Sequence, residues 1–529
     1  MKKQHYIDWI KENTLGYSIK ILNFDYIKDF NRLLKDDFFK EKVIEYGFNN
    51  FKAFGEKLQK FELKPITLIY APNSVGKSSF LHSLMHLQYF LQNHTKKQQI
   101  SLMKTDIFGD EIDLEGFINY VYKHENDRVI EYEIKIQNCN SAYLKGLGYN
   151  EFDIKKEYFF TKLLDNFEQE NIKKTIKLFI DMLNFEKNNF YKTQNYINEL
   201  EEFIKEQDKY KDIENLEFMV FLHLKLIILK SLNSENKLNF IKEYIQANLI
   251  KNQQYFINSL DVVIHIAIGK DEHESVYYFS NDEEIVFTSE SINKENSIVK
   301  EIDNIILQKT IQYIGPLRFY PDRNFILNSI EDKESNSFKA EDLWALLKKR
   351  KTLKNEISNW LSQPDKLKSH YEIIIENEKV FFLDKRNNTK VSHKDLGLGV
   401  SQVLPILISS YFARNKLIMI EQPELHLHPA VQAELADEIV KSYQRWNNHF
   451  VIETHSEYLL LRIMRIMRHT SQGKEFHNLK LTNEDIGILY IDADEIKTYI
   501  FPIKLSNDGK IIDKWPGGFF EEGFRERFE

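Results

Sequence analysis

A buried strand that leads through a tight loop into a helix constrains the fold of this chain more than any other feature. Residues 66–79 read Ile-Thr-Leu-Ile-Tyr-Ala-Pro-Asn-Ser-Val-Gly-Lys-Ser-Ser. The spacing matches the phosphate-binding loop (P-loop) pattern Gly-x-x-x-x-Gly-Lys-Ser/Thr, except that Ala71 takes the place of the first glycine. Alanine adds only a methyl group there, so we expect the loop to form and a helix to begin at Lys77.

The P-loop predicts a nucleotide site. Successive backbone N–H groups and the helix N-terminus form a nest for phosphate oxygens. We expect Lys77 to reach the β- and γ-phosphates and Ser78 to ligate Mg²⁺. The predicted cofactors are therefore ATP and Mg²⁺. The residues of this segment that we expect to surround them are Asn73, Ser74, Gly76, Lys77, Ser78 and Ser79.

Two later strands are each predicted to end in polar residues. Residues 417–421 are four apolar residues followed by Glu421, as in a buried parallel strand with an acid at its carboxyl end. Open α/β sheets place their ligands at that end, so Glu421 is the natural carboxylate on the Mg²⁺ side. Residues 449–453 form a second such strand, and His455 after it is predicted to sense the γ-phosphate.

A glycine-rich turn precedes these two strands in the sequence. Residues 395–402, Asp-Leu-Gly-Leu-Gly-Val-Ser-Gln, predict a turn that opens a second phosphate-binding helix. Gly399, Ser401 and Gln402 are its candidate nucleotide-binding residues. Serine at a helix N-terminus is ordinary by itself. The position of the segment between the P-loop and the Glu421 strand makes it informative.

Bulk properties narrow the class of protein. The chain has 529 residues, enough for two or more domains, and its formal net charge of −8 argues against a surface coated with basic residues. A local basic groove for nucleic acid stays open as an alternative. The single cysteine, Cys139, excludes disulfides and cysteine-based zinc sites. No signal peptide or membrane span is recognisable, so we expect a cytoplasmic protein with no membrane partner.

Changes in residue pattern predict five segments. Residues 155–255 contain no proline and show helical periodicity, which predicts an α-helical domain inserted between two halves of a core. The predicted organisation is a helical extension at 1–46, the first half of the core at 47–154, the insertion at 155–255, the second half at 256–480 and a C-terminal module at 481–529. Alternating residues predict strands at 129–136 and 262–268 and a hairpin at 371–383.

The order of these motifs carries a resemblance to a known family. The stretches that match it best are 50–54 (Asn-Phe-Lys-Ala-Phe), 313–318 (Tyr-Ile-Gly-Pro-Leu-Arg), 420–429 (Ile-Glu-Gln-Pro-Glu-Leu-His-Leu-His-Pro), 453–456 (Glu-Thr-His-Ser) and 513–520 (Asp-Lys-Trp-Pro-Gly-Gly-Phe-Phe). The chain resembles the RecF/SMC-like and OLD-like soluble ABC-type "AAA family ATPases" that carry a C-terminal module of unknown function. The implied fold is an α/β ABC-type P-loop ATPase head, with a mixed sheet and flanking helices, interrupted by the helical insertion. The resemblance covers residues 47–140 and 305–529 but not the insertion.

The family resemblance implies a role in ATP binding, metal binding or catalysis for each of these residues. Two heads sandwich ATP, so that Lys77 and Ser78 of one head face Ser401 of the other. Glu421 takes the acidic position of the Walker B motif, and the metal-side residues are Ser78 and Glu421. The usual catalytic glutamate falls on Gln422, whose amide cannot act as a base, and Glu424 offers a substitute carboxylate. Gln422, Glu424 and His455 are the candidate catalytic residues.

Three further groups of residues allow two interpretations each. His426 and His428 could pair on a metal, but their irregular loop favours a structural role. Asp492-Ala-Asp494 resembles part of a TOPRIM nuclease site. A nuclease domain needs far more chain than follows Asp494, so a turn is favoured. Arg318 and Arg323 could pair with buried carboxylates or contact phosphate, and the sequence favours neither.

Three functions fit these observations. The first is an ATPase subunit of a bacterial anti-phage defence system that dimerises or oligomerises and controls a separate effector such as a nuclease. The second is a RecF-like DNA-repair ATPase that clamps duplex DNA, which predicts a basic groove and salt-dependent affinity. The third is a nucleotide-gated scaffold with little turnover, which the glutamine at position 422 favours. The first rests on analogy at the level of the fold.

Overall fold

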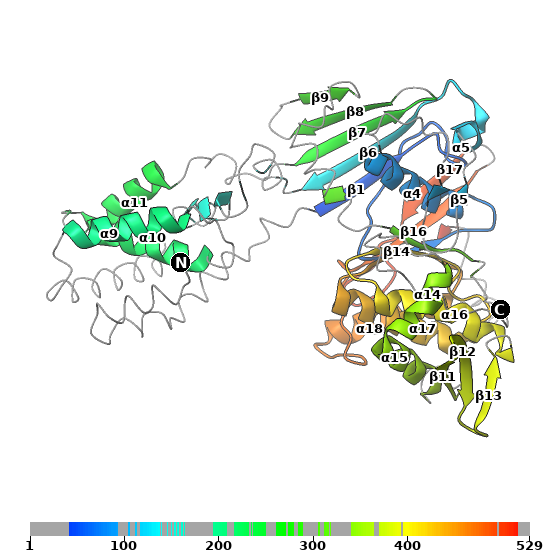
Figure 1. Cartoon of the computed structure of the whole chain (residues 1–529). Coiled ribbons are helices and arrows are strands. Elements are labelled where there is room, and N and C mark those ends of the chain that lie inside the picture. The colour runs from blue at the N-terminus through cyan, green and yellow to red at the C-terminus, as the bar shows by residue number, and fades with distance from the viewer. Residues whose placement is uncertain are drawn as a thin grey trace.

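The structure is a computed structural model of the whole chain, shown in Figure 1. It describes residues 42–93, 104–105, 112–113, 117–137, 194–208, 216–231, 236–249, 261–270, 273–279, 284–288, 311–316, 340–363, 370–392, 395–494 and 497–516, with some single residues between these ranges. Arg323 and residues 1–41 lie outside the described residues, so the expectations for them stay predictions.

The P-loop strand lies inside a six-stranded central sheet of order β10-β14-β15-β3-β16-β17. The strands are β10 (Ile311–Ile314), β14 (Leu417–Glu421), β15 (His449–Glu453), β3 (Ile66–Tyr70), β16 (Ile486–Ala493) and β17 (Thr498–Pro502). The first five run parallel, and β17 is antiparallel to β16. Because β3, from the first predicted half, lies between β15 of the second half and β16 of the C-terminal segment, these parts of the chain share one sheet.

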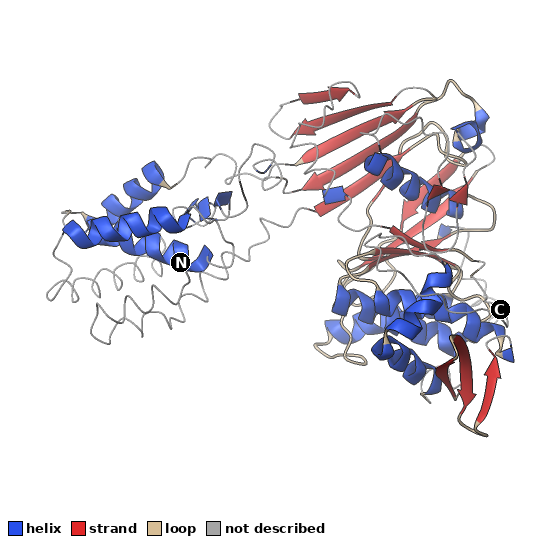
Figure 2. Ribbon diagram, in the orientation of Figure 1, coloured by secondary structure: helices blue, strands red, loops and turns tan. Residues whose placement is uncertain are grey.

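Alternate residues of the central sheet feed two hydrophobic cores, as the period of a strand requires. Leu68, Ile420 and Ile452 point into the core shared with five helices. These helices are α14 (Ala340–Lys349), α15 (Lys351–Ser362), α16 (Leu398–Phe412), α17 (Pro429–Trp446) and α18 (Glu457–Ser471). Ile69 and Val451 point to the other face, where helix α4 (Lys77–Asn93) lies. Figure 2 shows the helices α14–α18 gathered on one side of the sheet.

A second six-stranded sheet, antiparallel throughout, packs with α4 on that other face. Its order is β2 (Gln59–Phe61), β1 (Lys42–Phe48), β6 (Ile130–Gln137), β7 (Val262–Ile268), β8 (His273–Phe279) and β9 (Glu284–Thr288). The strands predicted at 129–136 and 262–268 are confirmed as β6 and β7, and they pair with each other across the insertion. Residues 42–46 belong to β1 and not to a helical extension, because they hydrogen-bond to β6.

Four short elements are described between α4 and β6 in the sequence. They are β4 (Lys104–Thr105), β5 (Ile112–Asp113), α5 (Phe117–Tyr120) and the 3₁₀ helix η3 (Tyr122–His124).

The hairpin predicted at 371–383 is confirmed as β11 (Tyr371–Glu376) and β12 (Lys379–Asp384), which β13 (Thr389–Ser392) extends to three strands. Ser358 of α15 accepts a hydrogen bond from the backbone of Ile373 and ties this small sheet to the helical layer.

Three helices are described within the predicted insertion. They are α9 (Gln194–Asp208), α10 (Leu216–Ser231) and α11 (Lys237–Asn248). Lys230 of α10 contacts Glu201 of α9 and the hydroxyl of Tyr244 on α11, so one side chain joins all three. Figure 1 shows this group apart from the two sheets. The helical character of these parts matches the prediction, and the status of 155–255 as an inserted domain stays a prediction.

The C-terminal segment continues the central sheet instead of forming an appendage. Residues Ile486 to Tyr490 of strand β16 pair with the whole length of the P-loop strand β3. Trp515 packs edge-on against Tyr70 and Tyr490, with ring centroids 5.4 and 5.9 Å away. The described part of the predicted module at 481–529 is therefore physically continuous with the core that carries the P-loop. Among the described helices, none is long and apolar enough to cross a membrane.

Candidate functional site

The carboxyl ends of three neighbouring parallel strands meet at one edge of the central sheet. Strand β15 lies between β14 and β3, and the register places Glu421 and Ile69 on either side of Glu453. Ligands bind at this edge in open parallel sheets because loops and helix N-termini converge there. The sequence placed the P-loop, Glu421 and His455 at strand ends, and the structure brings all three to the same edge.

The P-loop connects β3 to α4 in the way that the motif predicts. Its backbone turns through left-handed conformations at Ser74 (φ 64°) and Gly76 (φ 112°). A side chain at Gly76 would adopt a rare backbone conformation and place its Cβ 3.1 Å from the Cβ of Ala53. Ala71 is fully buried, whereas Asn73 and Ser74 are exposed. The methyl group at position 71 is thus accommodated and the loop rim stays open to solvent.

Lys77 is held at the start of α4 with its ammonium group turned back over the loop. Its Nζ donates to the carbonyl oxygen of Pro72 at 2.9 Å and lies 3.9 Å from Oε1 of Glu453. The side chain is 7% exposed. Burial lowers the pKa of Lys77, and the neighbouring carboxylates of Glu453 and Glu421 oppose that shift. A phosphate bound in the loop would give the Lys77 ammonium a charged partner in place of the neutral backbone carbonyl oxygen that it now contacts.

Ser78 and Glu421 lie together, as the prediction of a metal pair requires. The Ser78 hydroxyl is 3.3 Å from Oε2 of Glu421, and the Tyr313 hydroxyl donates to Oε1 at 2.6 Å. Glu421 is 6% exposed at the end of β14. Hydroxyl and carboxylate oxygens are the ligands that Mg²⁺ accepts, usually beside phosphate oxygens and water. The residues at this position therefore fit the ion that the sequence predicts.

Sequence reasoning missed Glu453, a second buried acid of this site. It is 2% exposed, and burial, reinforced by the charge of Glu421, raises the pKa of Glu453 to about 8. The signal was available, because Glu453 ends a buried strand in the same way as Glu421. Two carboxylates this close cannot both ionise without cost, and the nearby ammonium of Lys77 compensates part of that cost.

Replacing Glu453 by glutamine should alter stability in a pH-dependent way. In the wild type, the folded chain keeps a proton on Glu453 between its ordinary pKa of 4.5 and about 8, whereas the unfolded chain has lost it. Wild-type stability therefore falls as the pH rises through this window. The nucleotide-free Glu453→Gln variant lacks this loss, so its thermal midpoint should exceed the wild-type midpoint increasingly up to about pH 8. The exposed Glu457→Gln variant is the control. A constant difference across the window would contradict the prediction.

Lys52 also lies beside this site and was not singled out by the sequence. Its Nζ is 2.6 Å from Nδ1 of His82, one turn beyond Ser78 in α4. Burial lowers the pKa of Lys52 to about 8, and the charge of Glu421 opposes the shift. Burial and the Lys52 charge lower the pKa of His82 to about 3, so this imidazole is a neutral acceptor for the ammonium.

Arg318 joins the end of β14 to helix α16. Its guanidinium donates to the carbonyl oxygens of Glu421 at 2.7 Å and Gln422 at 3.0 Å, and to Oε1 of Gln402 at 3.2 Å. Gln422 has a left-handed backbone (φ 44°), and its N–H donates to the carbonyl of Glu453. These contacts show Arg318 bracing the site, with a side chain 6% exposed. They also place Gln402 at the site's edge.

Glu424 is tied to the segment that contains His455. The Thr454 hydroxyl donates to Oε2 of Glu424 at 2.7 Å, and the backbone N–H of His455 donates to Oε1 at 2.6 Å. Burial and the Lys77 charge lower the pKa of His455, whereas Glu424 raises it. The imidazole is therefore neutral at physiological pH and can donate or accept one hydrogen bond. The structure thus brings Glu424 and His455 together beside Lys77.

Helix α16 starts earlier than the sequence suggested. Gly397 is its N-cap, and Leu398 in the first turn is 57% exposed. Gly399 is needed because a Cβ there would lie 2.7 Å from the carbonyl oxygen of His426. Ser401, expected at the exposed helix N-terminus, lies one turn further on and is 1% exposed. Its hydroxyl therefore faces the interior of the head, and the groups open to solvent are Gly397 and Leu398.

Two structural interpretations are confirmed. His428 caps helix α17, with Nδ1 accepting the backbone N–H of Ala430 at 3.2 Å, and His426 is exposed on the preceding loop. Asp494 closes the turn between β16 and β17 by accepting from the N–H of Lys497 at 2.7 Å and the hydroxyl of Tyr499 at 3.1 Å. The His428 and Asp494 side chains therefore hold the local backbone.

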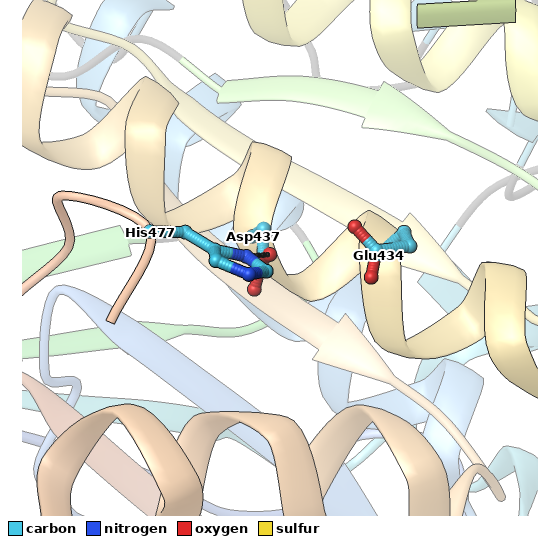
Figure 3. A group of neighbouring side chains, drawn as sticks. All are labelled: Glu434, Asp437 and His477. Carbon is cyan, nitrogen blue, oxygen red and sulfur yellow. Dashed lines mark hydrogen bonds and ion pairs between the residues drawn. The ribbon is translucent and has the colours of Figure 1, made fainter. Parts of the chain in front are cut away.

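A cluster of Glu434, Asp437 and His477 has ligand atoms close enough to hold a metal ion (Figure 3). Arg462 of α18 already occupies it. Its guanidinium donates to Oδ2 of Asp437 and Oε1 of Glu434, each at 2.7 Å. Nδ1 of His477 lies 2.7 Å from the same Asp437 oxygen. A resident cation side chain compensates the two buried acids, so we assign the cluster to the packing of α17 on α18.

These features together define a class of protein. A P-loop after an inner parallel strand, an acid-ended strand two places away and a polar segment after the strand between them form the nucleotide site of a P-loop ATPase. Residues 47–460 match the family model described as AAA ATPase domain. The chain belongs to this AAA ATPase family. Residues 481–528 match a second model, described as a protein of unknown function (DUF3696).

The solved structures similar to the chain include SMC head domains. One is an SMC head bound to the C-winged helix domain of ScpA, with 11% identity and a TM-score of 0.36, covering 88% of this chain and 98% of that chain. Another is the SMC head domain from Thermotoga maritima, with 8% identity and a TM-score of 0.34, covering 88% of this chain and 100% of that chain. No curated protein matches the chain.

Proposed function

We propose that this ATPase is a nucleotide-driven switch of an anti-phage defence system, which pairs its heads on ATP and so controls a separate effector such as a nuclease. The observation that carries the nucleotide part is the arrangement of Lys77, Ser78 and Glu421 at one sheet edge. Lys77 would bind the β- and γ-phosphates, and Ser78 and Glu421 would hold Mg²⁺. The defence role and the effector rest on analogy with ATPases of this kind.

The start of helix α16 supports the pairing of heads. Leu398 exposes 57% of its surface beside Gly397 at the start of a helix, where the first N–H groups have no acceptor four residues earlier in the helix. An exposed apolar residue at a helix N-terminus suits a surface that meets both a second copy and its bound phosphate. Because Ser401 is buried, we assign the contact across the dimer to this backbone and not to the Ser401 hydroxyl.

Slow turnover is the second part of the proposal. Gln422 follows the acid of β14 where the family carries its catalytic glutamate, and an amide cannot accept a proton from water. We propose that Glu424 takes this role, next to His455. Its carboxylate already accepts two hydrogen bonds, which hold it in place next to the His455 segment. A switch that remains closed for a long time after binding ATP suits the control of an effector.

The Glu424→Gln variant tests the assignment of the base. If Glu424 accepts the proton of the attacking water, turnover should fall by about 10²–10⁴-fold while ATP binding is retained. The Thr454→Val variant is the matched control, because it removes one hydrogen bond to Glu424 and leaves the carboxylate. Equal losses in both variants would make Glu424 a residue that holds the His455 segment, and unchanged turnover in Glu424→Gln would show that Glu424 is not the base.

Two measurements test the wider proposal. Size measurements with and without ATP should show association that depends on nucleotide, and loss of association in a Leu398→Asp variant would support the α16 surface. Stimulation of turnover by duplex DNA, with affinity that falls as salt rises, would favour the DNA-clamp alternative instead. A chain that stays monomeric with ATP under all conditions would overturn the pairing of heads.

A further inference from the structure

We propose that Tyr313 is a positioning residue for the metal side of the ATP site, acting through Glu421. The inference rests on the proposed function, because it gives Glu421 the Mg²⁺ side of the nucleotide. Tyr313 lies on β10, next to β14 in the sheet, and its hydroxyl donates to Oε1 of Glu421 at 2.6 Å. Neither the P-loop motif nor the pattern of the Glu421 strand predicts a hydrogen-bond donor to Glu421 so far away in the sequence.

The two oxygens of Glu421 have different partners. Oε1 receives the Tyr313 hydroxyl, whereas Oε2 faces the Ser78 hydroxyl at 3.3 Å. A carboxylate held on one oxygen presents the other in a fixed direction. Ser78 is the residue expected to ligate the ion, so the fixed direction leads to the metal position. Hydrogen bonds of this kind to a ligating carboxylate orient it and typically change metal affinity by about 10–100-fold when removed.

The tyrosine ring is itself fixed in place. Tyr313 is 4% exposed and belongs to the core between the central sheet and α4. Its ring lies edge-on to His82, with ring centroids 6.5 Å apart. His82 is one turn beyond Ser78 on α4. The ring therefore touches the same helix that carries the P-loop serine, and it links β14 to that helix through Glu421.

Two nearby ammonium groups explain why the hydrogen bond from Tyr313 to Glu421 would matter for metal binding. Lys52 and Lys77 both interact electrostatically with Glu421. A carboxylate with free rotation would be drawn towards one of these ammonium groups and away from the ion. The Tyr313 hydroxyl is a neutral donor, so it holds Glu421 without competing with Mg²⁺ for charge. The geometry thus separates the phosphate-binding cations from the metal-side acid.

The test measures Mg²⁺ dependence of nucleotide binding by the full chain. A fluorescent ATP analogue is titrated with excess EDTA and then at increasing Mg²⁺. For Tyr313→Phe we expect unchanged binding in EDTA and a Mg²⁺ requirement that rises about 10–100-fold. The control is Tyr443→Phe, which removes a similar bond, from the Tyr443 hydroxyl to Oδ1 of Asp485 at 2.6 Å, elsewhere in the protein. It should leave the Mg²⁺ requirement unchanged.

A double-mutant cycle separates positioning from a general effect on folding. If Tyr313 acts through Glu421, adding Tyr313→Phe to Glu421→Gln should cost no further Mg²⁺ affinity. Additive losses, or a wild-type Mg²⁺ requirement in folded Tyr313→Phe, would overturn the inference. A wild-type protein whose nucleotide binding ignores Mg²⁺ would instead overturn the proposed metal side of the site, so the two failures are distinguishable.

Discussion

Replacing Lys77 with alanine is expected to reduce ATP turnover by about 10²–10³-fold, the loss seen when a preorganised donor to transition-state charge is removed. The ammonium group is 7% exposed and already lies over the loop, 2.9 Å from the Pro72 carbonyl oxygen. Little reorganisation is needed for it to meet a phosphate. In so buried a position the attraction to phosphate is screened less than in water, which makes its loss large.

The Lys77→Ala experiment has a matched control in Lys416→Ala. Lys416 is a partly buried lysine whose pKa burial also lowers, but it precedes β14, at the opposite end of that strand from Glu421. Turnover by wild type, Lys77→Ala and Lys416→Ala is measured with Mg²⁺ and ATP in excess. Wild-type turnover in the Lys77 variant would show that the loop is not the hydrolytic site. Equal losses in both variants would point to a stability effect.

Local patterns predicted the centre of this fold well because its elements are defined by neighbouring residues. The apolar run at β3, the loop glycine and the helix start at Lys77 follow from residues 66–79 alone. Parallel strands ending in acids are recognisable in the same way, and the sheet order then brings their ends together. The same rule applied to Glu453 would have found the second buried acid of the site.

Local sequence patterns cannot predict which residues far apart in the sequence will contact each other. Tyr313 meets Glu421, and Arg318 meets Gln402, across more than 80 positions of sequence. Such pairs depend on which strands become neighbours, and residue spacing does not encode that. The C-terminal module is another case, because the pairing of β16 with β3 joins segments from opposite ends of the chain.

The misplacement of Ser401 has a different cause. Helix boundaries derived from sequence shift by a residue or two, and one residue changes the direction of a side chain by about 100°. Gly397 caps α16 without a side-chain hydrogen bond, so no serine, threonine or aspartate marks the start. Starting the helix at Leu398 turns Ser401 inward and leaves Gly397 and Leu398 exposed, which changes the surface that a second head would meet.

Replacing Arg462 with alanine is expected to lower the free energy of unfolding by about 3–5 kcal/mol, because it leaves buried acids without their cation. Glu434 and Asp437 are 8% and 0% exposed, and the guanidinium bonds to both. The control is Arg445→Ala, whose ion pair with Glu356 spans 3.3 Å between side chains 63% and 38% exposed. Such a surface pair contributes about 0–1 kcal/mol. Urea unfolding of both variants measures the difference.

The rescue experiment distinguishes an ion-pair network from a metal site. Neutralising the acids in an Arg462→Met, Glu434→Gln, Asp437→Asn triple variant should recover much of the loss, since the uncompensated charge is gone. If the acids instead held a metal ion, EDTA would lower the wild-type unfolding midpoint and the triple variant would stay as unstable as Arg462→Ala. An Arg462→Ala variant as stable as Arg445→Ala would show that α17 and α18 pack without help from the guanidinium.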